Sequence, residues 1–261
     1  MIKRFILSTS LIGAFGMVHV ARASSLDQGQ WITTVTGGMS FTSNDTLQPS
    51  ALGQVDAGRF DPAWAGVPAI ASLDHIDFSD AFDNGKSLGF EAGYMSMKDL
   101  EPFVRLQRTQ LNGNDLRIGS LELPDRVAPV SASFDDLKSW NLDLGVRYFF
   151  ADTGRVRAFV DGYAGAVRND SLNARVSVEG TPEPTVEERY LAQRTKFDTG
   201  LDGGVSLQVS DAADLSLSVG AQYVAGRQMD STAVDSLGVN GGSVNDEHWS
   251  MPVNLGVSFH F

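Results

Sequence analysis

The sequence contains no cysteine, has few basic residues relative to acidic ones, and has no long apolar segment after its N-terminus. Without cysteine, a disulfide framework and thiol chemistry are excluded. No later segment approaches the roughly 18 apolar residues that suggest a transmembrane helix, so we expect no helical membrane span. The 20 lysines and arginines against 32 acidic residues give a net charge of −12. This balance argues against a basic nucleic-acid-binding surface. The usual glycine-rich phosphate-binding motifs are absent, and we expect no cofactor.

The N-terminus resembles a secretory signal peptide. Lys3 and Arg4 precede an apolar stretch at residues 5–20, and Ala21-Arg22-Ala23 forms a small-residue cleavage site. No cysteine follows that site, which excludes a lipoprotein anchor. We therefore expect residues 1–23 to be removed and residues 24–261 to form one exported domain.

The C-terminal segment 247–261 alternates strictly between two faces. One face holds the apolar residues Trp249, Met251, Val253, Leu255, Val257, Phe259 and Phe261. Alternation with period two indicates a β-strand. A transmembrane strand needs roughly 9–11 residues, and this segment is long enough. It therefore predicts a strand with lipid on one side and a barrel lumen on the other.

Seven further segments alternate in the same way, some more clearly than others. They are residues 31–41, 86–94, 101–111, 139–150, 155–167, 196–209 and 214–225, and with 247–261 they make eight predicted strands. In the segment 101–111 the alternation is poor and the facing uncertain. In 155–167, placing Arg157 and Asp161 inside also places Phe159 and Tyr163 inside.

The connections between these segments alternate between short and long. The long ones, at about 43–85, 113–136, 170–192 and 227–246, hold most of the net negative charge. Short turns at one end and long loops at the other are typical of bacterial outer-membrane barrels. The sequence therefore predicts an all-β fold, a transmembrane up-and-down antiparallel barrel of eight strands with acidic extracellular loops. A ten-stranded barrel is the alternative, if the first long connection adds a hairpin. Phe60, Trp64, Phe78 and Phe82 suggest that this connection packs on something.

Residues 82–94 follow a Phe-x-x-Gly…Gly-Tyr pattern, and a short turn then leads to a strand beginning Leu100-Glu-Pro-Phe-Val-Arg105. This arrangement resembles the OmpA-type outer-membrane β-barrel family, which includes opacity-like and small porin-family surface antigens. The resemblance implies a location in the bacterial outer membrane. It also implies that Val257, Phe259 and Phe261 act as a signal for the outer-membrane assembly machinery. Larger relatives carry a periplasmic peptidoglycan-binding domain after the barrel, and we do not expect that activity here.

Eight charged residues are predicted to face the lumen: Glu91, Arg105, Asp143, Arg147, Arg157, Asp161, Asp198 and Asp202. An eight-stranded barrel is just wide enough for side chains to fill it, so these charges are expected to pair. The first interpretation is a structural salt-bridge plug. The alternative is a narrow ion path, in which the excess of acids would favour cations.

Two other groups could carry chemistry. His248 and Ser250 share one face of the C-terminal segment, as do the His and Ser of some lipid A deacylases, but no carboxylate partner can be assigned. Asp74, Asp77, Asp80 and Asp83 could hold Ca²⁺ through oxygen ligands, although the glycine and terminal glutamate of an EF-hand are missing. We expect a rim histidine and a solvated acidic loop instead, with no catalytic and no metal site.

The leading functional hypothesis is therefore a non-enzymatic outer-membrane surface protein, acting in envelope integrity or in loop-mediated binding and adhesion. A small porin-like channel is the second hypothesis, and a lipid A-modifying enzyme is a remote third. The expected partners are outer-membrane lipid and lipopolysaccharide, the assembly machinery, and an extracellular ligand or host surface contacted by the acidic loops. Nucleic acid is not an expected partner.

Overall fold

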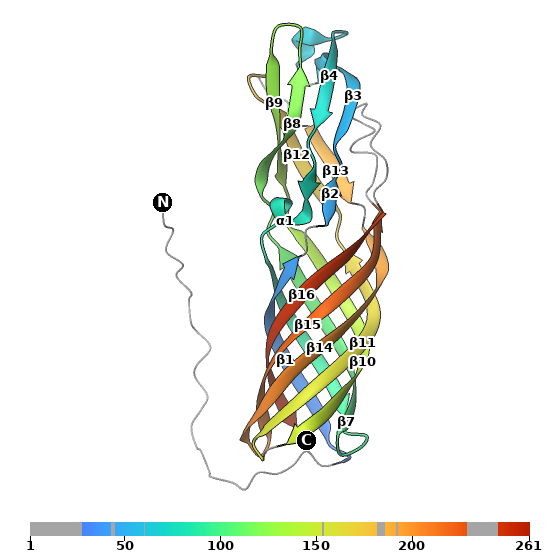
Figure 1. Ribbon diagram of the computed structural model, residues 1–261, viewed down its shortest axis with the longest axis vertical. Coiled ribbons are helices and arrows are strands. Elements are labelled where there is room, and N and C mark those ends of the chain that lie inside the picture. The colour runs from blue at the N-terminus through green and yellow to red at the C-terminus, as the bar shows by residue number, and fades with distance from the viewer. Residues whose placement is uncertain are drawn as a thin grey trace, which may run out of the picture.

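Eight long strands close into an antiparallel barrel in the order β1-β16-β15-β14-β11-β10-β7-β6 (Figure 1). The computed structural model describes residues 28–42, 45–59, 61–152, 154–181, 186–191, 193–228 and 245–261, so the predicted signal peptide lies outside the described residues. The barrel strands are β1 (Trp31–Thr42), β6 (Gly85–Tyr94), β7 (Leu100–Leu111), β10 (Leu137–Asp152), β11 (Val156–Asn169), β14 (Arg194–Ser210), β15 (Ala213–Gln228) and β16 (Asn245–His260). The eight-stranded prediction is confirmed. Within the described residues, no helix has the length and apolar character to cross a membrane.

The first and last strands pair with each other and close the barrel. Their register runs from Ile32 opposite His260 to Thr42 opposite Ser250. Closure satisfies every strand edge by hydrogen bonding, which a sheet in lipid requires. The short turns after β6, β10 and β14 lie at the same end as the C-terminus (Figure 1). By the pattern of outer-membrane barrels, this end is periplasmic.

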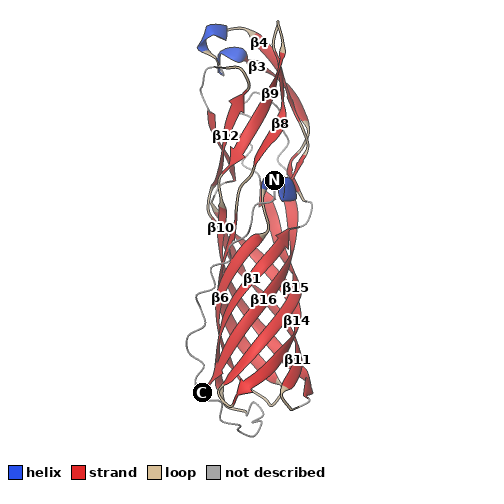
Figure 2. Ribbon diagram, turned by 90° about the vertical axis from the view of Figure 1, so that its left-hand side faces the viewer, coloured by secondary structure: helices blue, strands red, loops and turns tan. Residues whose placement is uncertain are grey.

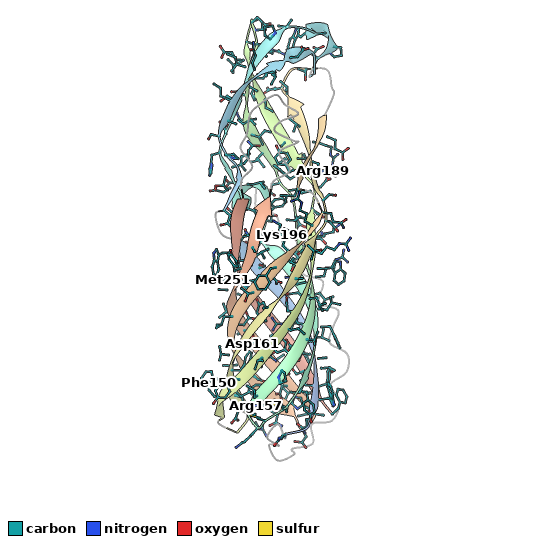
Figure 3. All side chains as sticks on the ribbon, turned by 90° about the vertical axis from the view of Figure 1, so that its right-hand side faces the viewer. Phe150, Arg157, Asp161, Arg189, Lys196 and Met251 are labelled. Atoms are coloured by element: carbon teal, nitrogen blue, oxygen red, sulfur yellow. The ribbon has the colours of Figure 1, made fainter. Side chains whose placement is uncertain are left out.

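Outward and inward residues separate as the alternation predicts. In β10, Leu142 and Leu144 are 56% and 65% exposed, whereas Asp143 between them is 1% exposed. Phe150 and Met251 mark the same outward face (Figure 3). The outer surface is therefore an apolar belt suited to lipid, around a polar interior.

The two strands of uncertain facing are now resolved. In β7, the inward side chains include Glu101, Phe103 and Arg105, and in β11 Phe159 and Tyr163 are buried in the lumen. Both strands place aromatic rings among charges, which is why their alternation is poor when judged by hydrophobicity alone.

The extracellular connections are not simple loops, and that expectation was wrong for three of them. Residues within 43–85, 113–136 and 170–192 form a six-stranded sheet in the order β13-β12-β9-β8-β4-β3. These strands are β3 (Ala51–Asp56), β4 (Pro68–Leu73), β8 (Asp115–Glu122), β9 (Val127–Phe134), β12 (Leu172–Val178) and β13 (Val186–Leu191). The sheet rises beyond the barrel rim and gives the molecule an elongated shape (Figure 2). We call it the extension. In the fourth connection, residues 229–244 lie outside the described residues.

The ten-stranded alternative is also wrong. The first connection does contain a hairpin, β3–β4, but β4 pairs with β8 of the extension and not with a barrel strand. The same connection holds β2 (Thr46–Gln48), β5 (Ile76–Asp77), the one-turn helix α1 (Phe78–Ala81), and two 3₁₀ turns, η1 (Ala57–Arg59) and η2 (Pro62–Trp64).

The extension has its own hydrophobic core. Leu121, Val130 and Val176 on its strands are almost fully buried, together with Phe78 and Phe82 around α1. Phe82 packs with ring centroids 4.7 Å from Phe78 and 5.9 Å from Phe134. Trp64 is partly buried against this core. The aromatic residues of the first connection therefore pack as expected, except Phe60, which lies outside the described residues.

Candidate functional site: the charged lumen

Two arginines occupy the middle of the lumen and bind carboxylates from four surrounding strands. Arg105 on β7 lies 3.0 Å from Glu91, 3.3 Å from Asp202 and 3.6 Å from Asp161. Glu91 comes from β6, Asp161 from β11 and Asp202 from β14. All three carboxylate side chains are at most 2% exposed. Charge-assisted hydrogen bonds of this kind are the strong ones inside a protein.

The second arginine completes the central network. Arg147 on β10 lies 2.8 Å from Glu91, 3.3 Å from Glu101 and 2.9 Å from Asp161. Glu91 and Asp161 therefore each bind both arginines. The network connects β6, β7, β10, β11 and β14 through the lumen, so its ion pairs link strands that are far apart in sequence.

Aromatic rings fill the space beside the two guanidinium groups. The Arg105 guanidinium lies 4.9 Å from the ring centroids of both Phe103 and Tyr163. The Arg147 guanidinium lies 5.2 Å from Phe103 and 4.8 Å from Phe159. These cation–π contacts stabilise the arginines in a site with little water.

Lumen-facing glycines make room for these bulky side chains. A Cβ atom at Gly145 would lie 2.3 Å from the Phe103 ring, and one at Gly200 would lie 2.3 Å from the Tyr163 ring. The inward glycines therefore do not widen a channel. They are the positions into which the large side chains of the facing strands fit.

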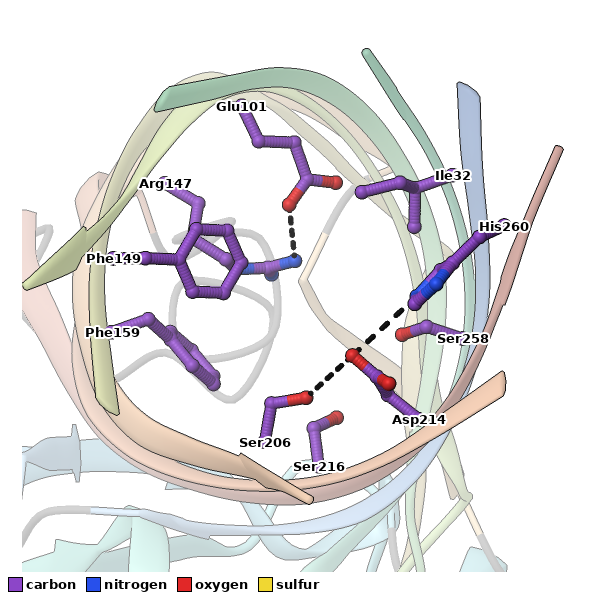
Figure 4. A pocket seen from close by; sticks show the side chains of 10 residues that line it. All are labelled: Ile32, Glu101, Arg147, Phe149, Phe159, Ser206, Asp214, Ser216, Ser258 and His260. Atoms are coloured by element: carbon purple, nitrogen blue, oxygen red, sulfur yellow. Dashed lines mark hydrogen bonds and ion pairs between the residues drawn. The ribbon is translucent and has the colours of Figure 1, made fainter. Parts of the chain in front are cut away.

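At the periplasmic end a separate group surrounds Asp214 (Figure 4). Asp214 forms an ion pair with Arg157, accepts a hydrogen bond from Ser206 at 3.0 Å, and lies 3.4 Å from Nε2 of His260. A cavity of about 20 Å³ lies next to this group, lined also by Glu101 and Arg147. A second cavity of about 20 Å³ lies beside Arg105. Each has room for roughly one water molecule.

Toward the extracellular end of the lumen, Asp143 and Asp198 form no ion pair among the described residues, although Arg105 lies directly opposite Asp143 in the strand register. Asp198 accepts hydrogen bonds from Asn141 at 3.1 Å and from Gln222 at 2.9 Å. Asp143 is 1% exposed, and neither of its carboxylate oxygens accepts a hydrogen bond from the part of the chain that the structure describes. Arg194 and Lys196 lie on the same face of β14 as Asp198, so this end of the lumen holds charges of both signs.

The structure places all eight predicted charges inside the barrel. Seven are buried, and Arg147 is buried except for a small fraction of its surface. Glu101, Asp214 and His260 belong to the same constellation and were not predicted as site residues. Glu101 was missed because the alternation of its strand is poor, and Asp214 because it begins a strand directly after a turn.

His248 has the carboxylate partner that sequence alone could not assign. Its Nδ1 lies 2.6 Å from Oδ2 of Asp45, a residue of the first connection, and its ring lies 5.1 Å from that of Phe78. The Ser250 hydroxyl lies 3.5 Å from the amide oxygen of Gln222. His248 therefore joins the barrel rim to the base of the extension.

The aspartates of the first connection do not converge on one point. Asp77 lies 2.9 Å from His75, Asp80 accepts a hydrogen bond from the Asp77 backbone, and Asp83 accepts one from Asn114. In the described ranges, no group of three or more His, Cys, Asp or Glu side chains is placed to hold a metal ion. The arrangement therefore gives no support to a calcium site.

The predicted assembly residues lie at the periplasmic end of β16. Phe259 and Phe261 point outward and are 45% and 74% exposed. Val257 lies on the same face, two residues before Phe259. Their role in assembly remains a prediction from the resemblance.

Comparison with known proteins gives structural neighbours only. No family model matches the sequence, and no curated protein matches it. Neisserial surface protein A is 14% identical, with 90% of this chain and 98% of that chain covered and a TM-score of 0.45. Ail, the attachment invasion locus protein of Yersinia pestis, is 12% identical, with coverage of 90% and 100% and a TM-score of 0.43. The outer-membrane protease OmpT from Escherichia coli is 8% identical, with coverage of 89% and 97% and a TM-score of 0.43.

The closed eight-stranded barrel, its apolar outer belt and its polar lumen define the chain as a bacterial outer-membrane β-barrel protein. The resemblance to OmpA-type and opacity-like barrels is confirmed at the level of the fold.

Proposed function

We propose that this protein is a non-enzymatic surface barrel that holds a rigid β-sheet extension outside the membrane for binding an extracellular ligand. The observation that carries this proposal is the extension itself. Its strands continue beyond the barrel and enclose a hydrophobic core that includes Leu121, Val176 and Phe82. Binding residues concentrate where a rigid scaffold presents them.

The lumen supports the proposal because it is occupied by paired charges and aromatic rings. The Arg105 and Arg147 networks cross the barrel at its centre, and the two cavities beside them are each the size of about one water molecule. A barrel filled in this way serves as a membrane anchor, and the extension is the part of the protein that contacts the ligand.

The distal part of the extension offers an apolar surface for such a contact. Leu52, Ile70 and Val127 are 71%, 44% and 64% exposed on its strands. Ile70 lies opposite Glu122, which in turn lies opposite Val127, so the two apolar side chains flank one carboxylate. A partner with an apolar patch bordered by basic residues fits this surface.

The test is adhesion of fluorescent vesicles that contain the refolded mature protein to cultured epithelial cells and to immobilised matrix proteins. We expect adhesion above that of empty vesicles, and its loss in the triple variant Leu52→Ser, Ile70→Ser, Val127→Ser. The matched control is Arg175→Ser, an exposed position on β12 that lies opposite Ser133, six residues along β9 from Val127. No adhesion by the wild type to any of these surfaces, or equal adhesion by the triple variant, would contradict the proposal.

We propose further that the His248 and Asp45 pair is structural. The histidine is 5% exposed, contacts Phe78, and holds the first connection against the barrel rim. Incubation of the protein with lipid A should leave its acylation pattern unchanged. Deacylation that disappears in a folded His248→Gln variant would establish the enzyme hypothesis instead.

A narrow cation path is the second candidate, and one observation favours it. Carboxylates outnumber arginines in the lumen, and Asp143 and Asp198 form no ion pair among the described residues. Discrete single-channel conductance steps with a preference for cations, reduced by Asp198→Asn, would favour this candidate over a closed lumen.

A further inference from the structure

The outer surface of the barrel carries charge in one place only, among the side chains that the structure describes. Four bases face outward: Lys86 on β6, Arg108 on β7, Lys138 on β10 and Arg168 on β11. All four are positive, although the chain as a whole has a net charge of −12. They occupy four consecutive strands of the barrel.

The strand register brings these bases together around one tryptophan. Arg108 lies directly opposite Trp140, and Trp140 lies directly opposite Arg168. Directly opposed residues have Cβ atoms about 4.5–5.5 Å apart. The Arg108 guanidinium also lies 5.5 Å from the Trp140 ring centroid. Two residues further toward the extension, Lys86 and Lys138 both lie opposite Gln110, one on each side.

This cluster lies at the extracellular boundary of the apolar belt. Below Trp140, the outward residues of β10 are apolar or aromatic from Leu142 to Phe150. Above it, Asp136 and Asp170 line a polar groove of about 670 Å³ together with Lys138. Tryptophan at such a boundary marks the level of the lipid headgroups.

The opposite side of the barrel has a different composition at this level. Tyr223 and Trp249 form an aromatic pair with ring centroids 5.1 Å apart, and Met251 on β16 lies beside them, opposite Phe41 on β1. Met39 on β1 lies directly opposite Lys86 and so marks the edge of the basic cluster. Among the side chains that the structure describes, the outward-facing bases are therefore confined to four neighbouring strands, as expected of a binding site and not of a general interfacial ring.

We propose that Lys86, Arg108, Lys138 and Arg168 form a binding site for the phosphate groups of a phosphorylated lipid in the outer leaflet. Guanidinium groups bind phosphate oxygens in a bidentate manner, and lysine ammonium groups bind them as point charges. The side chains project into the lipid layer beside Trp140, where acyl chains can pack on the apolar belt while the phosphates contact the bases.

The test is binding of lipid A species to the refolded mature protein in a neutral detergent, measured by native mass spectrometry and by titration. The probes are bisphosphorylated lipid A, monophosphorylated lipid A, lipid A with both phosphates removed, and inorganic phosphate. The test variant is Arg108→Gln with Arg168→Gln. The matched control is Arg126→Gln with Arg175→Gln, which removes two exposed positive charges from the extension.

We expect the affinity to fall from the bisphosphorylated to the dephosphorylated lipid. An interfacial base contributes about 1 kcal/mol toward an anionic lipid surface, so loss of two bases should weaken binding roughly 25-fold. The control should remain within about twofold of the wild type. Both variants should keep the heat-modifiable gel mobility of a folded barrel.

Three results would overturn the proposal. The first is equal affinity of the test variant and the wild type for bisphosphorylated lipid A. The second is undiminished binding of the dephosphorylated lipid, which would assign the affinity to acyl chains alone. The third is binding of inorganic phosphate as tight as that of the lipid, which would assign the site to a free anion.

Discussion

Replacement of Arg147 by methionine tests the lumen network most severely. The guanidinium contacts Glu91, Glu101 and Asp161 within 3.3 Å, and the arginine side chain is 11% exposed. Its removal leaves an excess of buried carboxylates that water cannot solvate well. Breaking a buried ion pair by removing one partner costs about 3–5 kcal/mol. We expect Arg147→Met to lower the free energy of unfolding by that amount.

The measurement is urea unfolding of the refolded protein in phospholipid vesicles, followed by tryptophan fluorescence and by heat-modifiable gel mobility. The control is Arg175→Met, because Arg175 lies 3.6 Å from Asp135 with side chains 63% and 45% exposed. An exposed pair of this kind contributes about 0–1 kcal/mol. Losses of similar size in the two variants would refute the reasoning.

A double variant separates charge from packing in the same experiment. Adding Glu101→Gln to Arg147→Met removes the carboxylate whose ion pair in the network is with Arg147 alone. The combined loss of stability should therefore be smaller than the sum of the two single losses. Strict additivity would show that Arg147 stabilises the barrel through packing and not through its charge.

Three further substitutions report on lumen packing, the extension core and the junction between them. Gly145→Ala forces a Cβ atom against an aromatic ring, so urea unfolding should show a loss of about 1–3 kcal/mol, whereas Gly162→Ala, with open space around its Cβ position, should change little. Phe82→Ala should destabilise the extension core by about 3–5 kcal/mol, seen as faster tryptic cleavage there while the barrel keeps its folded mobility. Asp45→Asn weakens the hydrogen bond to His248, and hydrogen exchange should show faster opening of the first connection; unchanged exchange would contradict a joining role for this pair.

The barrel could be predicted from sequence because its strands are long and their alternation is strong. In β10 and β16 nearly every second residue is large and apolar, since lipid covers one complete face. The extension strands are shorter and present small residues, such as Ala128 and Ala132 in β9. Their acidic residues, including Asp115 and Glu122, lie on strands and face solvent. In the sequence alone, this acidity favoured the prediction of loops.

The lumen could be predicted as a set of charges but not as a network. Facing follows from alternation along one strand, whereas pairing depends on the register between strands. Glu91 lies directly opposite Arg105, and Arg147 lies directly opposite Asp161. Such a register is fixed by turns and bulges that one strand's sequence does not reveal. The link between Asp45 and His248 was also hidden, because the two residues are far apart in the chain.

The central claim is that the lumen is closed and that the extension carries the function. Single-channel recording of the refolded mature protein in a planar bilayer, in concentrated KCl, tests it most directly. Heat-modifiable gel mobility must first show that the inserted protein is folded. The account predicts a silent bilayer, because the Arg105 and Arg147 networks cross the barrel. Discrete, salt-dependent conductance steps that lose their cation preference in Asp198→Asn would contradict it.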